Sequence, residues 1–401
     1  MTSESVLEIF KQITRIPRES GKEGPITAFL CNWAKNHSLQ YKTDKIGNVL
    51  IIKPASPGKE DVPVIVLQAH QDMVCEKIAG FKFDFTKDPV PYEIEDGWMI
   101  SKNTTLGADD GIGIAACLAL MESDTPCGRI ESLFTISEET GMDGAEALEE
   151  GFFTGKTLIN LDSEDEGQLF IGCAGGEHTD AWFHYEKERV KSGGKLIRLA
   201  IEGGIGGHSG DDINKHRANT VKLLADFLAG EISSDLQILS FVGGGKSNAI
   251  ARECSAVVAT ADSLGVAGRF GAYGNMIKAE YSETEPGLVF SADEVKGRGK
   301  AIDAGTAVAL VSALSECPHG VQKMSPDIEG LVQTSSNLAA VSMPEDGIVK
   351  VSTSQRSSVE AELDEVVEGV AEVFRKAGAS VDCYNKYPGW KPNLKSHILQ
   401  V

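Results

Sequence analysis

Four short segments of the sequence place histidine or carboxylate side chains where an apolar run ends. His70 and Asp72 follow the run VIVLQA, and Asp162 follows INL. The other two segments carry paired acids, Asp109 with Asp110 in TLGADDGIG and Glu138 with Glu139 in TISEETG. Positions two apart in a strand point to the same side, so we expect His70 and Asp72 to share a face.

Each of these segments, taken by itself, also has a simpler interpretation. A single His-x-Asp pair is often a hydrogen-bonded surface pair, adjacent glutamates are often solvated, and Asp109, Asp110 or Asp143 could cap a helix. Their combination favours a site, because like charges crowded at one sheet edge repel unless a cation or a proton neutralises them. Mixed imidazole and carboxylate ligands suit zinc or a similar divalent ion, and this number of ligands suits two ions.

The elements that must position these side chains alternate between strand and helix. The segments GNVLIIKPA, VPVIVLQAH, RIESLFTIS and KTLINLD have the pattern of strands, whereas DDGIGIAACLALME has that of a buried helix. Such alternation predicts an α/β sheet with helices on both faces. Functional groups of open α/β sheets gather beyond the carboxyl ends of the strands, which is where His70 and Asp72 are expected.

The pattern changes from roughly residue 190 onward. The next segments have the patterns of a strand, a helix and two further strands: GKLIRLAIEGG, HRANTVKLLADFLAGE, LQILSFVGGG and ECSAVVAT. A similar order of elements is repeated later in GIVKVSTSQRSS, VEAELDEVVEGVAEVFRKAG and SVDCYNKY. We therefore expect a second, α+β domain built from two related halves.

The composition restricts the class of protein. The 401 residues, 41% of them hydrophobic and 24% charged, are enough for two domains with a large core. A net charge of -21 argues against a surface that binds nucleic acid. The eight cysteines form no CxxC pair, which favours reduced thiols. The sequence shows neither signal-peptide features at the N-terminus nor a run of membrane-spanning length, so we expect a cytoplasmic protein without membrane contact.

The ordered series His-x-Asp, Gly-Ala-Asp-Asp-Gly, Glu-Glu-x-Gly and Leu-Asp-Ser-Glu-Asp resembles the co-catalytic zinc peptidases, the family of carboxypeptidase G and the carnosinases. The resemblance is strongest to dipeptidases of that family, and it extends from ITRIPRESGKEG through GGIGGHSGDDI and SNAIARE to YPGWKPN. It implies an α/β catalytic domain with a mixed sheet flanked by helices, and an inserted α+β lid domain. The implied boundaries are 1–186 for the catalytic domain, 187–386 for the lid, and 387–401 for an apparently truncated return to the catalytic domain.

The resemblance also implies roles for the residues at the strand ends. Asp72 would orient His70, Glu138 would be the general base that activates a metal-bridging water, and a cis peptide bond would join Asp109 to Asp110. The implied metal ligands are His70 and Asp162 on one ion, Glu139 on the other, and Asp109 bridging both.

Three further residues in the lid domain are implied to contact the substrate. His208 would polarise the scissile carbonyl, Asn248 would face the substrate, and Arg356 would hold the dipeptide's terminal carboxylate through its planar fork. Without the resemblance, His208 would be an exposed histidine in a glycine-rich turn. Asn248 would then be an ordinary turn residue and Arg356 a solvated strand residue.

The implied activity is metal-dependent hydrolysis of dipeptides, with Xaa-His and β-alanyl-histidine as substrates. The implied cofactors are two divalent ions, zinc first, with Mn²⁺ or Co²⁺ as alternatives, and a homodimer is compatible with the family. Two other functions stay open: hydrolysis of N-acyl amino acids, and binding of peptide or metal without turnover. Relatives carry a last metal-binding histidine well beyond YPGWKPN, whereas this chain stops at Val401 and His397 lies in a different context. We therefore leave one ligand position unassigned, and with it the activity of the chain as printed.

Overall fold

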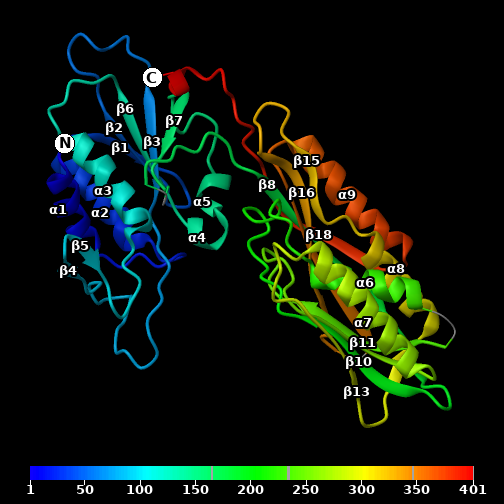
Figure 1. The fold of residues 1–401 in the computed structure, drawn as a ribbon. Coiled ribbons are helices and arrows are strands. Elements are labelled where there is room, and N and C mark those ends of the chain that lie inside the picture. Colours follow the sequence, from blue (N-terminus) through cyan, green and yellow to red (C-terminus); the bar gives the residue numbers. More distant parts are fainter. Residues whose placement is uncertain (164–165, 233–234, 346, 401) are drawn as a thin grey trace. The chain divides into compact units, whose positions relative to one another are not determined.

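The computed structural model describes residues 1–163, 166–232, 235–345 and 347–400 (Figure 1). The chain forms two compact units, Met1–Phe170 with His397–Val401 and Ile171–Ser396. Within the described residues, no helix has the length and apolar character needed to cross a membrane.

The first unit is built on a mixed five-stranded sheet in the order β1-β2-β6-β3-β7. β3 runs parallel to both β6 and β7, whereas β2 is antiparallel to β1 and β6. The strands are β1 Gln40–Thr43, β2 Val49–Lys53, β3 Ile65–His70, β6 Ile130–Thr135 and β7 Thr157–Asn160, and β4 Glu93–Glu95 with β5 Trp98–Ile100 form a separate hairpin. β6 is buried on both faces, as a strand near the middle of a sheet must be.

Three helices cover one face of this sheet: α1 Ser3–Ile13, α2 Gly24–Asn36 and α3 Ala108–Glu122. α1 begins with a capping box between Thr2 and Ser5, and it buries Phe10 and Ile13. The opposite face is covered at Leu50 and Leu133 mainly by Phe152.

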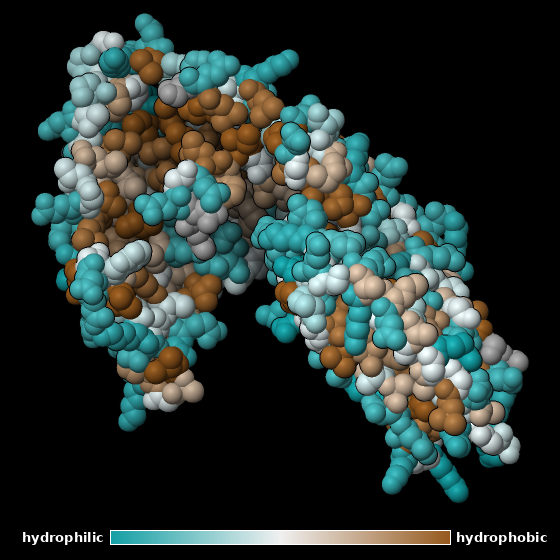
Figure 2. Space-filling model, viewed as in Figure 1, coloured by the Kyte–Doolittle hydropathy of each residue, from teal (hydrophilic) through white to brown (hydrophobic). Residues whose placement is uncertain are grey.

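The prediction of helices on both faces thus holds for one face of the described structure. The reason lies in the connection from β6 to β7, whose only helices are the short α4 Glu138–Gly141 and α5 Asp143–Glu146. Figure 2 shows apolar side chains over a broad part of this unit's surface, and its large exposed apolar residues include Ile94, Trp98 and Leu158.

The second unit contains a large antiparallel sheet in the order β13-β10-β12-β11-β16-β17-β8-β18, with β15 paired to β16. Its strands are β8 Gly175–His184, β10 Lys195–Glu202, β11 Gln237–Gly244, β12 Cys254–Thr260, β13 Val289–Glu294, β15 Gly320–Met324, β16 Val332–Ser342, β17 Ile348–Ser357 and β18 Ser380–Tyr387. β9 Lys187–Arg189 and β14 Lys300–Ile302 form a small sheet of their own.

The strand order confirms the prediction of two related halves. In chain order, β10, α6 Thr220–Glu231, β11, β12, α7 Ser263–Glu280 and β13 form one half. The other half has the same sequence of elements in β8, α8 Ala304–Glu316, β16, β17, α9 Glu360–Lys376 and β18. The spatial orders mirror each other, and the halves meet where β11 pairs with β16.

The helices of the second unit cover one face of its large sheet, where the core includes Phe183, Phe241 and Phe374. Along β17, Val349 and Val351 belong to this core, so the alternate positions Ser352, Ser354 and Arg356 point to the other face. We call this second side the helix-free face.

The observed division of the chain differs from the implied boundaries at 186 and 387. β8 lies between β17 and β18 in the second unit's sheet, because its residues pair with both strands along their length. A backbone bridge joins Cys173 to Trp390, so both connecting segments stay with the second unit. The chain re-enters the first unit at His397, which begins the 3-10 helix η1 His397–Gln400.

Candidate metal and substrate sites

The parallel strands β3, β6 and β7 bring their carboxyl ends to one edge of the first sheet. His70 is the last residue of β3, and Asp162 follows β7 by two residues. Glu138 follows β6 by three residues, after Ser137 in a left-handed conformation with φ of 52°. The start of α3 brings Asp109 to the same edge.

His70 is the centre of this cluster and is fully buried. Its Nε2 lies 2.8 Å from Asp109 Oδ1, 3.6 Å from Asp162 Oδ1 and 4.0 Å from Glu138 Oε2. One histidine nitrogen is therefore surrounded by carboxylate oxygens from three different segments of the chain.

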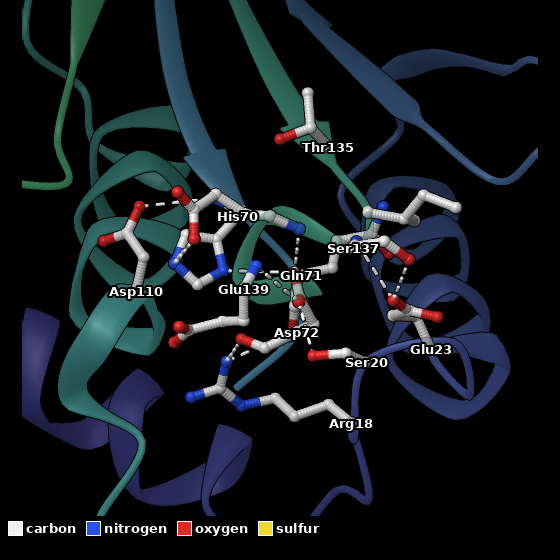
Figure 3. A network of polar contacts seen from close by, with 12 residues as sticks. Arg18, Ser20, Glu23, His70, Gln71, Asp72, Asp110, Thr135, Ser137 and Glu139 are labelled. Carbon is white, nitrogen blue, oxygen red and sulfur yellow. Dashed lines mark hydrogen bonds and ion pairs between the residues drawn. The ribbon is translucent and has the colours of Figure 1, made fainter. Parts of the chain in front are cut away.

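Asp72 fixes the other side of the imidazole (Figure 3). Its Oδ1 lies 3.2 Å from His70 Nδ1 and also accepts a hydrogen bond from the Glu138 backbone N–H at 3.1 Å. Its Oδ2 accepts hydrogen bonds from the Glu139 backbone N–H at 3.2 Å and from Ser20 Oγ at 2.7 Å. A single buried carboxylate thus orients the histidine and the turn that carries both glutamates.

Arg18 and Ser20 were not predicted as site residues. Arg18 is 2% exposed, and its guanidinium donates to the backbone carbonyls of Gln71, Asp72 and Gly107. Burial lowers the pKa of Arg18 to about 10. The signal available in the sequence is the segment RIPRES, which is part of the resemblance.

The peptide bond between Asp109 and Asp110 is cis, as the resemblance implied. Asp110 is buried, with Oδ2 accepting from the His70 backbone N–H at 3.2 Å and Oδ1 from the Gly113 N–H at 3.1 Å. Its contacts are therefore those of a helix cap that also holds the end of β3.

The cluster concentrates negative charge in a half-buried place. Burial raises the pKa of Asp109 and Glu139, and it raises the pKa of Glu138 to about 7, with nearby carboxylates adding to the effect. Burial opposes the charged form of His70, but hydrogen bonds to Asp162, Asp72 and Asp109 raise its pKa to about 11. Both effects indicate a site that gains stability from an added cation.

The donor set fits divalent metal ions. Among the described residues, two groups hold ligand atoms within 4.8 Å of one another: His70 with Asp109 and Asp162, and His70 with Glu138 and Glu139. Imidazole nitrogen and carboxylate oxygen at this spacing are typical ligands of zinc and its neighbours. His397 belongs to neither group.

A cavity of about 500 Å³ opens beside these residues, a volume suited to a small molecule. Asp109, Glu139 and Asp162 line it together with apolar residues that include Leu106 and Ile112. The cavity therefore combines charged groups with walls that can bury an apolar part of a ligand.

The helix-free face of the second unit contains the three other predicted residues. The His208 ring accepts at Nδ1 from the Gly210 backbone N–H at 3.3 Å, and a Cβ added at Gly210 would lie 3.2 Å from that ring and 3.7 Å from Arg356 Cδ. His208 and Arg356 are therefore neighbours. Asn248 is exposed, and its carbonyl accepts from the Ser209 N–H at 2.8 Å, which ties its loop to the His208 loop.

Known proteins similar to this chain were found by sequence and by structure, although no family model matches it. It is 36% identical to the cytosol non-specific dipeptidase of Escherichia coli (strain K12), over all of this chain and 83% of that protein. It is also 37% identical to the aminoacylhistidine dipeptidase of Vibrio alginolyticus, whose crystal structure is known. The two structures align over all of this chain and 82% of that one, with a TM-score of 0.94. The fold is shared by an M20 family metallo-carboxypeptidase of Sulfolobus solfataricus, which is 12% identical to this chain. That alignment covers all of this chain and 82% of the other, with a TM-score of 0.50.

Proposed function

The chain belongs to the M20 family of metallopeptidases and hydrolyses dipeptides, and we propose that Xaa-His dipeptides, including β-alanyl-histidine, are among its substrates. The observation that carries the proposal is the convergence of three carboxylates on His70 Nε2 at one sheet edge. The names of both similar dipeptidases support the reaction, and that of the Vibrio enzyme supports the substrate class.

The metal ligands divide between two ions in this proposal. His70, Asp109 and Asp162 would hold one ion, and Glu139 together with Asp109 would hold the other. We propose zinc, because it accepts imidazole and carboxylate ligands together, and Mn²⁺ or Co²⁺ could occupy the same donors. When bound, the ions supply a Lewis acid that polarises the peptide carbonyl and acidifies water.

Glu138 acts as the general base, taking a proton from the attacking water and delivering it to the leaving amine. Its backbone is held by Asp72, whereas its side chain is 35% exposed and therefore accessible to water. Glu138 and Glu139 have separate tasks: the first moves a proton, and the second binds metal. Asp72 supports both by orienting His70 and the turn.

The second unit supplies groups for the substrate. Arg356 binds the terminal carboxylate through its planar fork, Asn248 hydrogen-bonds the peptide, and His208 stabilises the negative charge that develops on the carbonyl oxygen. The proximity of the His208 loop to Arg356 supports a shared role for these two residues.

A substrate panel tests the proposal against hydrolysis of N-acyl amino acids. The metal-loaded protein is assayed on β-alanyl-histidine, alanyl-histidine and N-acetyl-histidine, with zinc, manganese or cobalt. We expect both dipeptides to be cleaved faster than the acetylated amino acid, and Asp109→Ala to abolish cleavage together with metal binding. Preference for N-acetyl-histidine would assign the protein to the other reaction, and metal binding without any cleavage would leave a binding protein.

The proposal also extends to the location and assembly of the protein. The name of the Escherichia coli relative supports a cytoplasmic location. A homodimer is compatible with the family, and sedimentation of the metal-loaded protein measures the assembly.

A further inference from the structure

The helix-free face of the second unit contains buried polar atoms that have no hydrogen-bond partner in the described structure. They are His178 Nδ1, Ser209 Oγ, Asn337 Oδ1 and Arg356 Nε. Leaving such an atom unpaired costs about 1–3 kcal/mol, so proteins rarely gather several in one place without a ligand or water to meet them. Ser209 and Asn337 are 2% and 1% exposed, which makes these atoms part of a built surface.

Strand pairing places His178 beside Arg356. His178 in β8 lies opposite Ser354 in β17, and Gly176 lies opposite Arg356. His178 and Arg356 are thus diagonal neighbours on one face, a relation that separates residues by about 7 Å.

Two tyrosines of β18 complete the walls of this place. A Cβ added at Gly176 would lie 2.7 Å from the Tyr387 hydroxyl, which accepts a hydrogen bond from Arg356 Nη1 at 3.3 Å. The His178 ring stacks on Tyr384 with ring centroids 5.5 Å apart and planes 29° apart. Gly176 therefore leaves room for Tyr387, and Tyr384 holds the plane of the imidazole.

The charges of this place suit a carboxylate with a polar neighbour. Arg356 has no ion pair with the residues that the structure describes, so its positive charge is free for an anion. Asp180, an acid on the same face, is already paired with Lys350 at 2.7 Å and with Ser352 at 2.6 Å. Burial and the charge of Arg356 lower the pKa of His178, which favours the neutral form of its imidazole. A neutral ring offers one hydrogen bond without repelling a second imidazole.

We propose that His178 is a specificity-determining residue for the C-terminal amino acid of the substrate, and that its Nδ1 hydrogen-bonds a polar side chain such as imidazole. This inference rests on the proposed dipeptidase activity and on Arg356 as the carboxylate ligand. The carboxylate and the side chain of the substrate's C-terminal residue are attached to the same α-carbon. They can therefore reach Arg356 and His178, which are diagonal neighbours, at the same time. The subsite thereby favours C-terminal histidine over C-terminal alanine.

Two substitutions separate hydrogen bonding from packing. His178→Phe keeps an aromatic ring to stack on Tyr384 but removes Nδ1, whereas His178→Asn places a polar amide atom near the position of Nδ1. His216→Phe is the matched control, because His216 stacks in the same way on Tyr281 in the same unit, with ring centroids 4.7 Å apart.

The measured quantity is the ratio of kcat/KM for alanyl-histidine to kcat/KM for alanyl-alanine, with saturating metal. We expect His178→Phe to lower this ratio about tenfold, mainly through KM for alanyl-histidine, because one hydrogen bond to the side chain is lost. His178→Asn should recover most of the ratio, and His216→Phe should leave it at the wild-type value.

Two results would overturn the inference. An unchanged ratio in His178→Phe would remove His178 from specificity, and equal losses on both substrates in His178→Phe and His178→Asn would assign it a structural role. A wild-type protein that cleaves no dipeptide would instead overturn the proposed function on which the inference rests. If only the inference fails, the wild-type enzyme cleaves dipeptides normally, and substitutions at residue 178 leave the ratio of the two kcat/KM values unchanged.

Discussion

Replacing Asp72 by asparagine tests how the metal site is held, because this change keeps the shape of the side chain and removes its charge. The carboxylate of Asp72 has contacts at both oxygens: His70 Nδ1 and the Glu138 N–H at Oδ1, and Ser20 and the Glu139 N–H at Oδ2. An amide has one acceptor oxygen and one NH₂ group, so it cannot accept on both sides.

The least costly orientation of the asparagine keeps its oxygen toward His70 and the Glu138 N–H. The NH₂ group then faces the backbone N–H of Glu139, and a hydrogen bond to a charged acceptor, worth about 1.5–3 kcal/mol, is lost. The imidazole also loses the negative charge that makes its metal-facing nitrogen more basic. Supporting groups of this kind change metal affinity by roughly 10–100-fold.

Competition with a chromophoric zinc chelator measures that affinity, and urea unfolding of the chelated protein measures the loss of stability separately. We expect Asp72→Asn to weaken metal binding 10–100-fold. Ser20→Ala is the matched control, since it removes one hydrogen bond from Oδ2 and leaves the charge in place. Its effect on affinity should be a few-fold at most. Wild-type metal affinity in Asp72→Asn would refute the assignment of Asp72 as the group that orients His70.

Three other predictions concern separate parts of the chain. Arg356→Lys should raise KM for free dipeptides far more than for C-terminally amidated ones, since only the free forms present a carboxylate to the planar fork; equal changes would exclude Arg356 from carboxylate binding. Gly144→Ala should destabilise the first unit by about 1–3 kcal/mol in urea unfolding, because the added Cβ would lie 2.5 Å from the backbone N and O of Ile136. His319 accepts a hydrogen bond from the Leu338 N–H at 3.3 Å, and burial lowers its pKa from 6.5 to about 4. Its stabilising contribution is therefore fully present above pH 6.5 and is lost as the pH falls toward 4, by up to about 3 kcal/mol. Urea unfolding between these pH values should show that slope, and His319→Gln should flatten it.

The proximity of His70, Glu138 and Asp162 could be predicted from the sequence, because each of them follows an apolar run. VIVLQAH forms β3 and ends at His70, and the runs before Glu138 and Asp162 form β6 and β7. Parallel pairing of these strands then brings the three ends together. Local pattern and one topological rule are sufficient here.

Arg18 shows where such reasoning stops. Its guanidinium donates to backbone carbonyls 53, 54 and 89 residues away. Every residue has a backbone carbonyl, so residue types do not indicate which carbonyls will accept these hydrogen bonds. The segment Gly175–His184 shows a second limit, because alternation can predict a strand without predicting which sheet the strand joins. Its pairing with β17 and β18 assigns it to the second unit, and only the three-dimensional structure provides that pairing.

Glu138→Gln tests the proposal that Glu138 moves the proton while its neighbours bind metal. The substitution keeps the shape of the side chain and removes the base. We expect metal content and affinity to stay at wild-type values while kcat for alanyl-histidine falls by at least about 100-fold. Glu146→Gln, at an exposed position in α5, is the matched control and should retain full activity. Wild-type turnover in metal-loaded Glu138→Gln would show that Glu138 is not the general base.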